Sequence, residues 1–264
     1  MSRSTMDHIG GTVFDLSGKV ALVTGGNGGL GLAMSKGLAK AGADIAIWGR
    51  NADKNAAAVA VLSPLGTKVT AFECDVTDSD SVRAAFENTV EHFGQVDVCF
   101  ANAGGSGPSG MLHELSDEAW DSVVDLNLNS VVKTFRAMTG HLLSRKAPGK
   151  LIVTSSVASM MGTPRAAGYA TTKAAVNGLV RSLAVELGRA DIQVNAILPG
   201  YIETEMSLDT PQAFQDACRR RSASGKIGTL EDMEGIAVFL ASDESHLMTG
   251  QTLVLDGGHT IHPM

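Results

Sequence analysis

Short apolar runs alternate with longer segments of helical spacing along nearly the whole chain, and this alternation restricts the possible folds more than any other feature. Such alternation is typical of β-α-β units, in which successive strands run parallel. A parallel sheet has to be covered by helices on both faces. The pattern therefore predicts an α/β fold, a doubly wound parallel sheet flanked by helices. No repeat or linker divides the chain, so we expect residues 1–264 to form a single domain.

The apolar runs and the helical periodicity also predict where each element lies. The polar residues 1–13 are expected to form a loose N-terminal arm. Residues 203–227 interrupt the alternation after the sixth strand, and an insertion at that end of a strand usually covers a ligand, so we expect a substrate lid there. A solvated surface hairpin is the alternative. Strands are expected over 19–24, 44–48, 68–72, 96–101, 150–155, 192–198 and 252–255, and helices over 30–41, 52–62, 78–93, 117–143, 167–189 and 230–241.

Charge and cysteine content exclude several classes of protein. With 28 acidic against 21 basic residues, the net charge is −7, which disfavours nucleic-acid binding. No apolar run approaches the roughly 18 residues that a membrane-spanning helix needs. Cys74, Cys99 and Cys218 are odd in number and widely spaced, which fits neither a disulfide framework nor a metal site. We therefore expect no metal, no membrane partner and a reducing, cytoplasmic location.

A glycine-rich segment follows the first predicted strand and opens the first predicted helix. Glycines there allow a dinucleotide pyrophosphate to approach the backbone, and the helix N-terminus supplies N–H groups. Two spacings fit, one beginning at Gly26 and one at Gly25. A glycine-rich turn without a ligand is the alternative. The residues expected to hold the cofactor here are Gly25, Asn27, Gly28, Gly29, Leu30 and Gly31.

The end of the second strand bears on the choice between the two nicotinamide cofactors. Rossmann-type domains that bind NAD usually place a carboxylate there for the ribose 2′-hydroxyl. This chain has Trp48-Gly49-Arg50 instead. A guanidinium suits a 2′-phosphate, so Arg50 favours NADP(H), with NAD(H) as the second possibility. A merely exposed arginine is the alternative interpretation.

A tyrosine and a lysine share one face of the predicted helix over 167–189. Tyr169 and Lys173 are four residues apart. For a tyrosine to act as a base at neutral pH, its pKa has to fall by about 3 units, or roughly 4 kcal/mol. An ammonium about 4 Å away supplies roughly that energy. Ser156, at the end of the preceding strand, could hold a reacting oxygen, although chemistry alone does not separate it from Ser155.

Taken in order, these motifs resemble the short-chain dehydrogenase/reductase family over nearly the whole chain. The second glycine spacing matches that family's Thr-Gly-x-x-x-Gly-x-Gly, and Tyr169 with Lys173 matches its Tyr-x-x-x-Lys. Gly28 departs from the pattern, because many NADP-preferring members carry a basic residue there. The further matching positions are Asp75 and Val76, Asn102-Ala103-Gly104, Asn127, Ser156, Pro199-Gly200, Ile202 and Thr204.

The resemblance implies a role for each matched position. Tyr169 would be the general acid or base and Lys173 would lower its pKa and bind the nicotinamide ribose. Ser156 would hold the substrate oxygen, and Asn127 would support a water that links Lys173 to solvent. The remaining matched positions would contact the cofactor. Family members are commonly tetramers, so we expect a homo-oligomer, and Tyr201 is expected beside the substrate.

The function predicted from the sequence is an NADP(H)-preferring oxidoreductase that interconverts a secondary alcohol and a ketone. Two substrate classes remain open. A polar pocket would suit sugars, polyols or sugar acids, whereas a pocket lined by Met160, Met161 and Met206 would suit 3-oxoacyl thioesters, steroids or other apolar ketones. The alternatives of another class are a catalytically silent cofactor-binding regulator, or an isomerase or dehydratase that uses bound nicotinamide.

Overall fold

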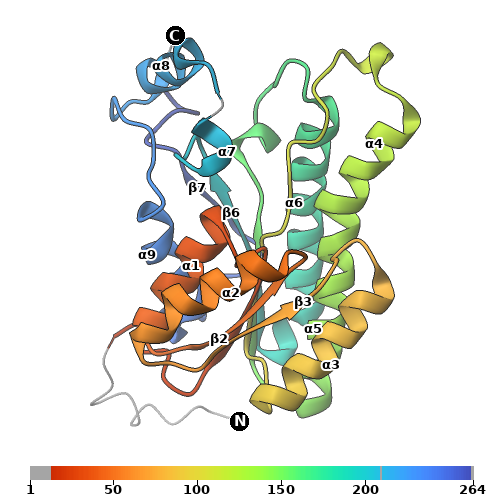
Figure 1. Ribbon diagram of the computed structural model, residues 1–264, viewed down its shortest axis with the longest axis vertical. Helices are drawn as coiled ribbons and strands as arrows, with labels where there is room; N and C mark the ends of the chain where they lie inside the picture. Colours follow the sequence, from red (N-terminus) through yellow and green to blue (C-terminus); the bar gives the residue numbers. More distant parts are fainter. Residues whose placement is uncertain (1–12, 209, 263–264) are drawn as a thin grey trace.

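The computed structural model describes residues 13–208 and 210–262, and one seven-stranded sheet forms its centre (Figure 1). The order is β3-β2-β1-β4-β5-β6-β7, and every neighbouring pair is parallel. The predicted doubly wound α/β fold is therefore confirmed. The strands are β1 Val20–Thr24, β2 Asp44–Gly49, β3 Val69–Glu73, β4 Val98–Ala101, β5 Gly149–Thr154, β6 Ile192–Pro199 and β7 Thr252–Leu255.

Helices cover both faces of this sheet. Buried side chains of α1, α2 and α9 form one apolar core against it, and those of α3, α5 and α6 form a second core on the opposite face. The helices are α1 Gly29–Lys40, α2 Ala52–Leu62, α3 Ser79–Phe93, α4 Asp117–Val124, α5 Ser130–Arg145, α6 Ala167–Leu187, α7 Glu205–Leu208, α8 Gln212–Arg221 and α9 Asp232–Ala241.

The two cores follow from the alternation of side chains along each strand. In β1, Val20 and Leu22 belong to one core, and Ala21 and Val23 to the other. Because both faces are buried, the strand is apolar at every one of these positions. The side chains of β1 therefore alternate in direction, but its sequence shows no alternation of polar and apolar residues.

The chain order of the strands places a crevice between β1 and β4. From β1 the chain proceeds outward to β2 and β3, then crosses to β4 and continues in the other direction. β1 and β4 remain neighbours, with Val23 opposite Phe100. Helices leave the carboxyl ends of these two strands on opposite faces, so a crevice opens there, where ligands of such folds bind. The predicted site residues between 25 and 31 and at 102–104 follow these two strand ends.

The predicted elements differ most from the structure at the long helix and at the fourth strand. The expected helix over 117–143 is divided into α4 and α5 by a π-helical turn, Asp125–Asn129. The fourth strand begins later than expected, because the Val96 N–H donates to His141 Nε2 at 3.2 Å and ladder bonding starts beyond it. The lid segment contains the two short helices α7 and α8. The expected arm, residues 1–13, lies outside the described residues except for Val13.

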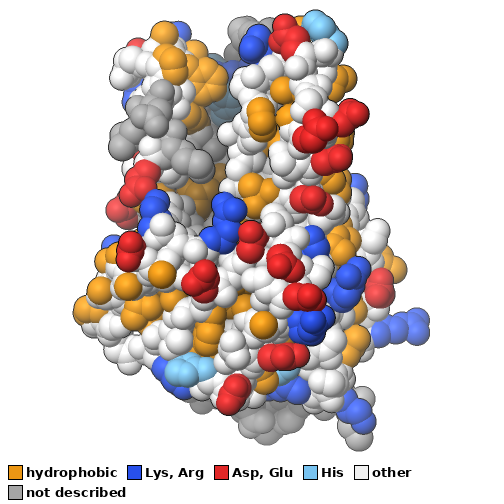
Figure 2. Space-filling model, turned by 45° about the vertical axis from the view of Figure 1, so that its right-hand side comes forward, with side chains coloured by type: hydrophobic (Ala, Val, Ile, Leu, Met, Phe, Trp, Pro, Cys, Tyr) orange, Lys and Arg blue, Asp and Glu red, His pale blue; other side chains and the backbone are white. Residues whose placement is uncertain are grey.

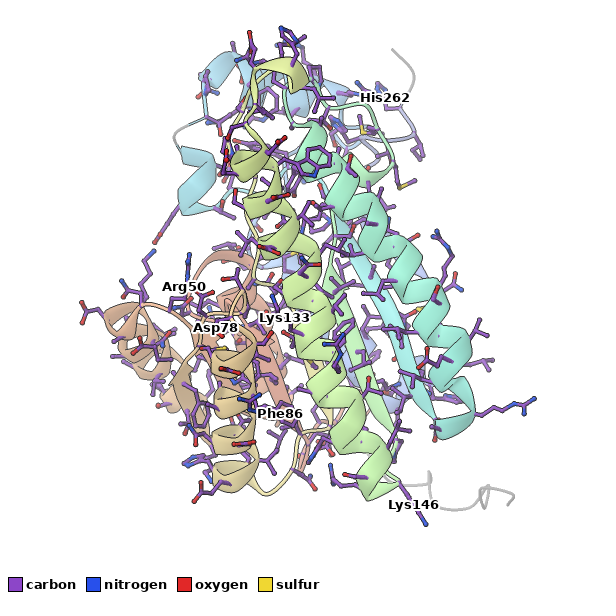
Figure 3. The ribbon with its side chains drawn as sticks, turned by 90° about the vertical axis from the view of Figure 1, so that its right-hand side faces the viewer. Arg50, Asp78, Phe86, Lys133, Lys146 and His262 are labelled. Atoms are coloured by element: carbon purple, nitrogen blue, oxygen red, sulfur yellow. The ribbon has the colours of Figure 1, made fainter. Side chains whose placement is uncertain are left out.

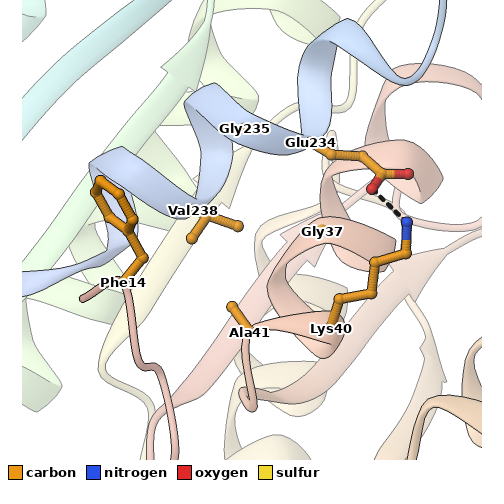
Figure 4. A pocket seen from close by; sticks show the side chains of 7 residues that line it. All are labelled: Phe14, Gly37, Lys40, Ala41, Glu234, Gly235 and Val238. Atoms are coloured by element: carbon orange, nitrogen blue, oxygen red, sulfur yellow. Dashed lines mark hydrogen bonds and ion pairs between the residues drawn. The ribbon is translucent and has the colours of Figure 1, made fainter. Parts of the chain in front are cut away.

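A cavity of about 430 Å³ lies between α1 and α9, away from the crevice (Figure 4). Phe14, Ala41 and Val238 line it, and the Lys40 ammonium contacts the Glu234 carboxylate at 2.6 Å on one side. Gly37 allows the two helices to approach, because a Cβ there would lie 2.9 Å from the Glu234 Cα. This cavity belongs to the packing of the two helices. Within the described part of the chain, none of the helices has the length and apolar character to cross a membrane.

Candidate active site

The turn between β1 and α1 is lined by backbone. Gly25 and Gly29 have φ angles of +64° and +48°, a region that favours glycine. A Cβ added at Gly28 or Gly29 would meet no described atom within 4 Å, so the turn is open. The first turn of α1 carries no acidic residue and no side-chain cap, so nothing in it offsets the positive potential of its N–H groups. The geometry fits a pyrophosphate, with Gly31 packed behind it against Gly25 and Asn102.

A hydrogen-bond network joins the carboxyl ends of β1, β4 and β5. The Thr24 hydroxyl accepts from the backbone N–H groups of Asn102 at 3.0 Å and Ala103 at 2.9 Å. The Asn102 Nδ2 donates to the Thr24 carbonyl at 3.1 Å, and its Oδ1 accepts from the Thr154 hydroxyl at 3.1 Å. The network holds the glycine turn and the 102–104 turn together, so these two predicted cofactor segments form one wall of the crevice.

Asn127 lies within the π-helical turn and is 1% exposed. Its Oδ1 accepts from the Gly105 N–H at 3.0 Å, and its Nδ2 donates to the Gly105 carbonyl at 2.9 Å. The widened turn, in which the Ser130 N–H reaches back to the Asp125 carbonyl, turns Asn127 toward β4. Such turns are frequent at functional sites. Both polar ends of the amide are therefore used to hold the segment after Gly104.

Lys173 reaches the centre of the crevice from α6. Its ammonium donates to the Thr154 carbonyl at 2.7 Å, and a Cβ on Gly104 would lie 3.4 Å from Nζ and 2.8 Å from Asn127 Oδ1. The structure thus brings Lys173, Asn127 and Gly104 together. Burial disfavours the charged form and lowers the pKa of Lys173 to about 8.

Tyr169 lies one helical turn before Lys173, whose Nζ is 5.6 Å from the centre of the phenol ring. Burial raises the pKa of Tyr169, and a hydrogen bond with the Ser156 side chain opposes that rise. The Lys173 ammonium is directed at the Thr154 carbonyl. That Lys173 lowers the pKa of Tyr169 stays a prediction. Without a cofactor, Tyr169 is therefore a protonated phenol at neutral pH.

The backbone around Ser156 is held by neighbouring side chains. The Ser156 hydroxyl oxygen accepts from the Ala158 N–H at 3.1 Å, which leaves its proton for another acceptor. The Ser159 hydroxyl donates to the Ser156 carbonyl at 2.6 Å and accepts from Asn177 Nδ2 at 2.9 Å. Ser155, by contrast, donates to the Lys173 carbonyl at 2.9 Å and is 2% exposed. The structure therefore places Ser156, and not Ser155, beside Tyr169.

Charged residues gather where the adenosine end of a dinucleotide would lie. Arg50, at the end of β2, is 3.9 Å from the Asp75 carboxylate and has a largely exposed side chain. The Thr77 hydroxyl lowers the pKa of Asp75, with a smaller contribution from Arg50. Lys133 crosses from α5 and donates to the Thr77 carbonyl at 2.7 Å, and Figure 3 shows Arg50 and Lys133 near the start of α3. A cavity of about 350 Å³ opens between Arg50 and the π-helical turn.

The remaining predicted residues follow β6. Gly200 packs against Asp256, where a Cβ would lie 2.7 Å from the Asp256 Cβ, and its N–H extends the ladder to Leu255. Ile202 is buried and pairs with Gly228. Thr204 exchanges hydrogen bonds with Ser207 at the start of α7. Pro199 pairs with Leu255, and the buried Val76 and partly buried Leu30 pack into the two cores.

Tyr201 contacts the segment 203–227, the expected lid. Its hydroxyl donates to the Ser207 carbonyl at 3.1 Å, and its ring meets Phe214 of α8 edge to face at 5.8 Å. The predicted contact between Tyr201 and the substrate stays a prediction. Figure 2 shows a hollow between two projecting lobes at this end of the molecule, with basic side chains below it. The side chain of Met206 lies outside the described residues, whereas Met160 is exposed.

The sequence argument missed several residues that organise the crevice. Thr24 and Thr154 carry the network between strand ends, and Ser159 with Asn177 holds the Ser156 loop. Their types are ordinary at strand ends and on helices, so no pattern distinguishes them. The position of Thr24 next to the glycine turn was a usable signal, because a hydroxyl at a strand end can cap the N–H groups of the neighbouring turn.

The fold and the site define a class: doubly wound α/β proteins with a glycine-lined turn at the switch point and a Tyr-Lys pair beside it. A sequence model of the family described as enoyl-(acyl carrier protein) reductase matches residues 25–260. The chain belongs to the short-chain dehydrogenase/reductase family, which confirms the resemblance inferred from its motifs.

Relatives with named activities cover almost the entire chain. It is 37% identical to gluconate 5-dehydrogenase of Gluconobacter oxydans, over 94% of this chain and 97% of that one. It is 35% identical to the 3-oxoacyl-[acyl-carrier-protein] reductase FabG of Chlamydia muridarum, over 92% and 98%. Carveol dehydrogenase from Mycobacterium avium, solved in complex with NAD, superposes with a TM-score of 0.90 at 29% identity, over 93% and 99%.

Proposed function

We propose that this protein is an NAD(P)-dependent oxidoreductase that interconverts a secondary alcohol and a ketone. The observation that carries the proposal is the meeting of Ser156, Tyr169, Lys173 and Asn127 beside the glycine-lined turn. A protein that only bound the cofactor would not need a half-buried phenol with a serine partner. The named relatives are enzymes, which also disfavours the regulatory alternative.

The residues around the crevice fit a nicotinamide dinucleotide. Gly25 and the open N-terminus of α1 suit the pyrophosphate, and the segments around Asp75 and Asn102 suit the adenosine. Pro199, the last residue of β6, and Thr204, which lies just before α7, are the positions that the family resemblance places beside the nicotinamide. When bound, the nicotinamide accepts or supplies a hydride, which is chemistry that no side chain of the chain provides.

Tyr169 is placed to move the proton that accompanies the hydride. Its raised pKa keeps the phenol protonated at neutral pH, so it can donate to the oxygen of a ketone during reduction. The Ser156 hydroxyl, whose oxygen is already bonded to the Ala158 N–H, can donate its proton to the same oxygen. In the oxidation of an alcohol the phenolate form is required, and a cationic ring nearby would favour it.

Lys173 and Asn127 support the proton transfer by Tyr169 indirectly. Lys173 is anchored on the Thr154 carbonyl and retains two further ammonium hydrogens, which can serve a ribose hydroxyl. Asn127 holds the Gly105 backbone and so keeps the segment after Gly104, which borders the crevice, in place. A water that links Lys173 to solvent, as the family resemblance implies for Asn127, remains part of the proposal.

We assign NADP(H) as the preferred cofactor because of Arg50. Its guanidinium lies at the end of β2 with 69% of its side chain exposed, and it can therefore turn toward a 2′-phosphate. The Asp75 carboxylate nearby is a competing partner, and NAD(H) is accordingly the second possibility. The homotetramer and the cytoplasmic location are further proposals, carried by the family resemblance and by the three thiols.

The experiment is cofactor turnover measured with sugar acids, polyols, steroids and 3-oxoacyl thioesters. Each substrate is run in both directions with NADP(H) and NAD(H), beside the variant Tyr169→Phe. Turnover that requires Tyr169 would support the proposal and show which of the two open substrate classes applies. Tight cofactor binding without any Tyr169-dependent turnover would contradict it in favour of a cofactor-binding regulator.

A further inference from the structure

Asn55 is a buried amide on α2 that faces the end of β2. It is 6% exposed, and both ends of its side chain are bonded. Its Nδ2 donates to the Gly49 carbonyl at 2.9 Å, and its Oδ1 accepts from the Nδ2 of Asn27 at 2.7 Å. Asn55 thereby joins the turn after β1 to the turn after β2. These are the two turns that would flank the adenosine ribose of a bound dinucleotide.

The orientation of both amides follows from the Gly49 carbonyl. A carbonyl can only accept hydrogen bonds, so Asn55 has to present its NH₂ group to it. The Asn55 oxygen then faces Asn27, and Asn27 in turn has to present its own NH₂ group. The series of hydrogen bonds from Asn27 through Asn55 to the Gly49 carbonyl thus fixes which end of the Asn27 amide lies against β2. Asn55 itself is buried away from the crevice.

Gly49 makes room for this arrangement. A Cβ at that position would overlap the Asn27 Nδ2 and lie 2.5 Å from the Asn55 Oδ1. The Asn27 nitrogen therefore lies directly over Gly49, the residue before Arg50. One of its two hydrogens is bonded to Asn55, and within the described residues the other has no acceptor. Because Gly49 precedes Arg50, the N–H donor of Asn27 and the guanidinium of Arg50 belong to neighbouring positions at the end of β2.

We propose that Asn55 is a positioning residue for cofactor selection, which holds the Asn27 NH₂ group beside Arg50 and thereby favours a 2′-phosphate. The inference rests on the proposed function and deepens it. A phosphate oxygen only accepts hydrogen bonds, so it depends on the amide end that faces it. A ribose 2′-hydroxyl both donates and accepts, and it tolerates either end. Loss of Asn55 should therefore affect NADPH far more than NADH.

The test is the dissociation constant of each cofactor, measured by fluorescence titration without substrate. Asn55→Leu keeps the size of the side chain and removes both hydrogen bonds. NADPH binding should weaken about 10-fold, as expected for loss of a hydrogen bond to a charged group, and NADH binding less than about 2-fold. Leu62→Val, on the same helix and buried at 0% exposure, is the control for general loosening of α2 and should leave the ratio of the two constants unchanged.

A double-mutant cycle shows whether Asn55 acts through Asn27. In an Asn27→Ala background, Asn55→Leu should change the NADPH/NADH ratio by less than about 2-fold. Equal weakening of both cofactors by Asn55→Leu, or independent effects in the cycle, would overturn the inference. If the unmodified protein bound neither cofactor, the proposed function would fail as well. Tight NADH binding with no Asn55-dependent selectivity would remove this inference alone.

Discussion

The Lys173 ammonium donates a 2.7 Å hydrogen bond to the main-chain carbonyl of Thr154, the last residue of β5. This bond ties the middle of α6 to the end of the strand that leads to Ser156. It explains how a lysine that is 5% exposed is accommodated in the interior. Burial of the same ammonium lowers the pKa of Lys173 to about 8.

The lowered pKa predicts a specific dependence of stability on pH. Between about pH 8 and the unfolded value of 10.5, the unfolded lysine holds a proton that the folded one has lost. The free energy of unfolding should therefore rise with pH in this window relative to Lys173→Met, by up to about 3 kcal/mol. Denaturant unfolding of both proteins at pH 7, 9 and 10.5 measures the difference, and a constant difference would contradict the burial argument.

Replacing the phenol should separate chemistry from binding. In Tyr169→Phe the ring still fills its place, but no proton can be transferred, and turnover should fall about 10³-fold. The dissociation constant of the cofactor should change little. Tyr201→Phe is the matched variant, because its hydroxyl bonds the Ser207 carbonyl within the lid, and it should retain most of kcat. Comparable losses in the two variants would refute the role given to Tyr169.

Ser156→Ala should move the pH profile to higher pH. The hydrogen bond from Ser156 opposes the rise in the pKa of Tyr169 that burial causes, so its loss allows the pKa to rise further. Oxidation of the alcohol, which needs the phenolate, should then require more alkaline conditions. Profiles of kcat/KM against pH test this. Ser155→Ala, which removes a bond to the Lys173 carbonyl, should destabilise the fold without such a shift.

Arg50→Ala should weaken NADPH binding more than NADH binding. Because the side chain is largely exposed, we expect roughly a 10-fold effect that diminishes as salt is added. Arg83→Ala removes another exposed arginine, paired with Asp80 on α3, and should leave both constants unchanged. Titrations at two ionic strengths give the comparison. An equal loss for both cofactors would remove the argument for NADP(H).

Two glycines of the same turn should respond differently to alanine. At Gly31 a Cβ would overlap the Gly25 carbonyl and lie 2.6 Å from Asn102 Nδ2, so Gly31→Ala should cost about 2 kcal/mol of stability. At Gly28 the φ angle is −176° and the surrounding space is open, so Gly28→Ala should fold normally. The added methyl group would project into the open turn between β1 and α1 and weaken cofactor binding. Thermal unfolding and cofactor titration together distinguish the two effects.

Much of the fold was predictable because its signals are local. The apolar runs located all seven strands of the sheet, and Asp78 at the start of α3 and Asn51 before α2 are capping residues of the usual type. The π-helical turn at Asp125–Asn129 was not predictable, because the segment has ordinary helical composition. The pairing of the Asn127 amide with Gly105, which accompanies the turn, involves residues 22 positions apart in the chain.

The sequence by itself determined the order of strands and helices, the glycine turn and the spacing of Tyr169 and Lys173, since these depend on neighbouring residues. Tertiary structure alone decided that Ser155 bonds the Lys173 carbonyl, that Lys173 bonds Thr154, and that Asn55 orients Asn27. The physical reason is that hydrogen-bond partners and pKa values depend on burial and on groups from distant strands. The topology of the sheet brings those groups together at its carboxyl edge.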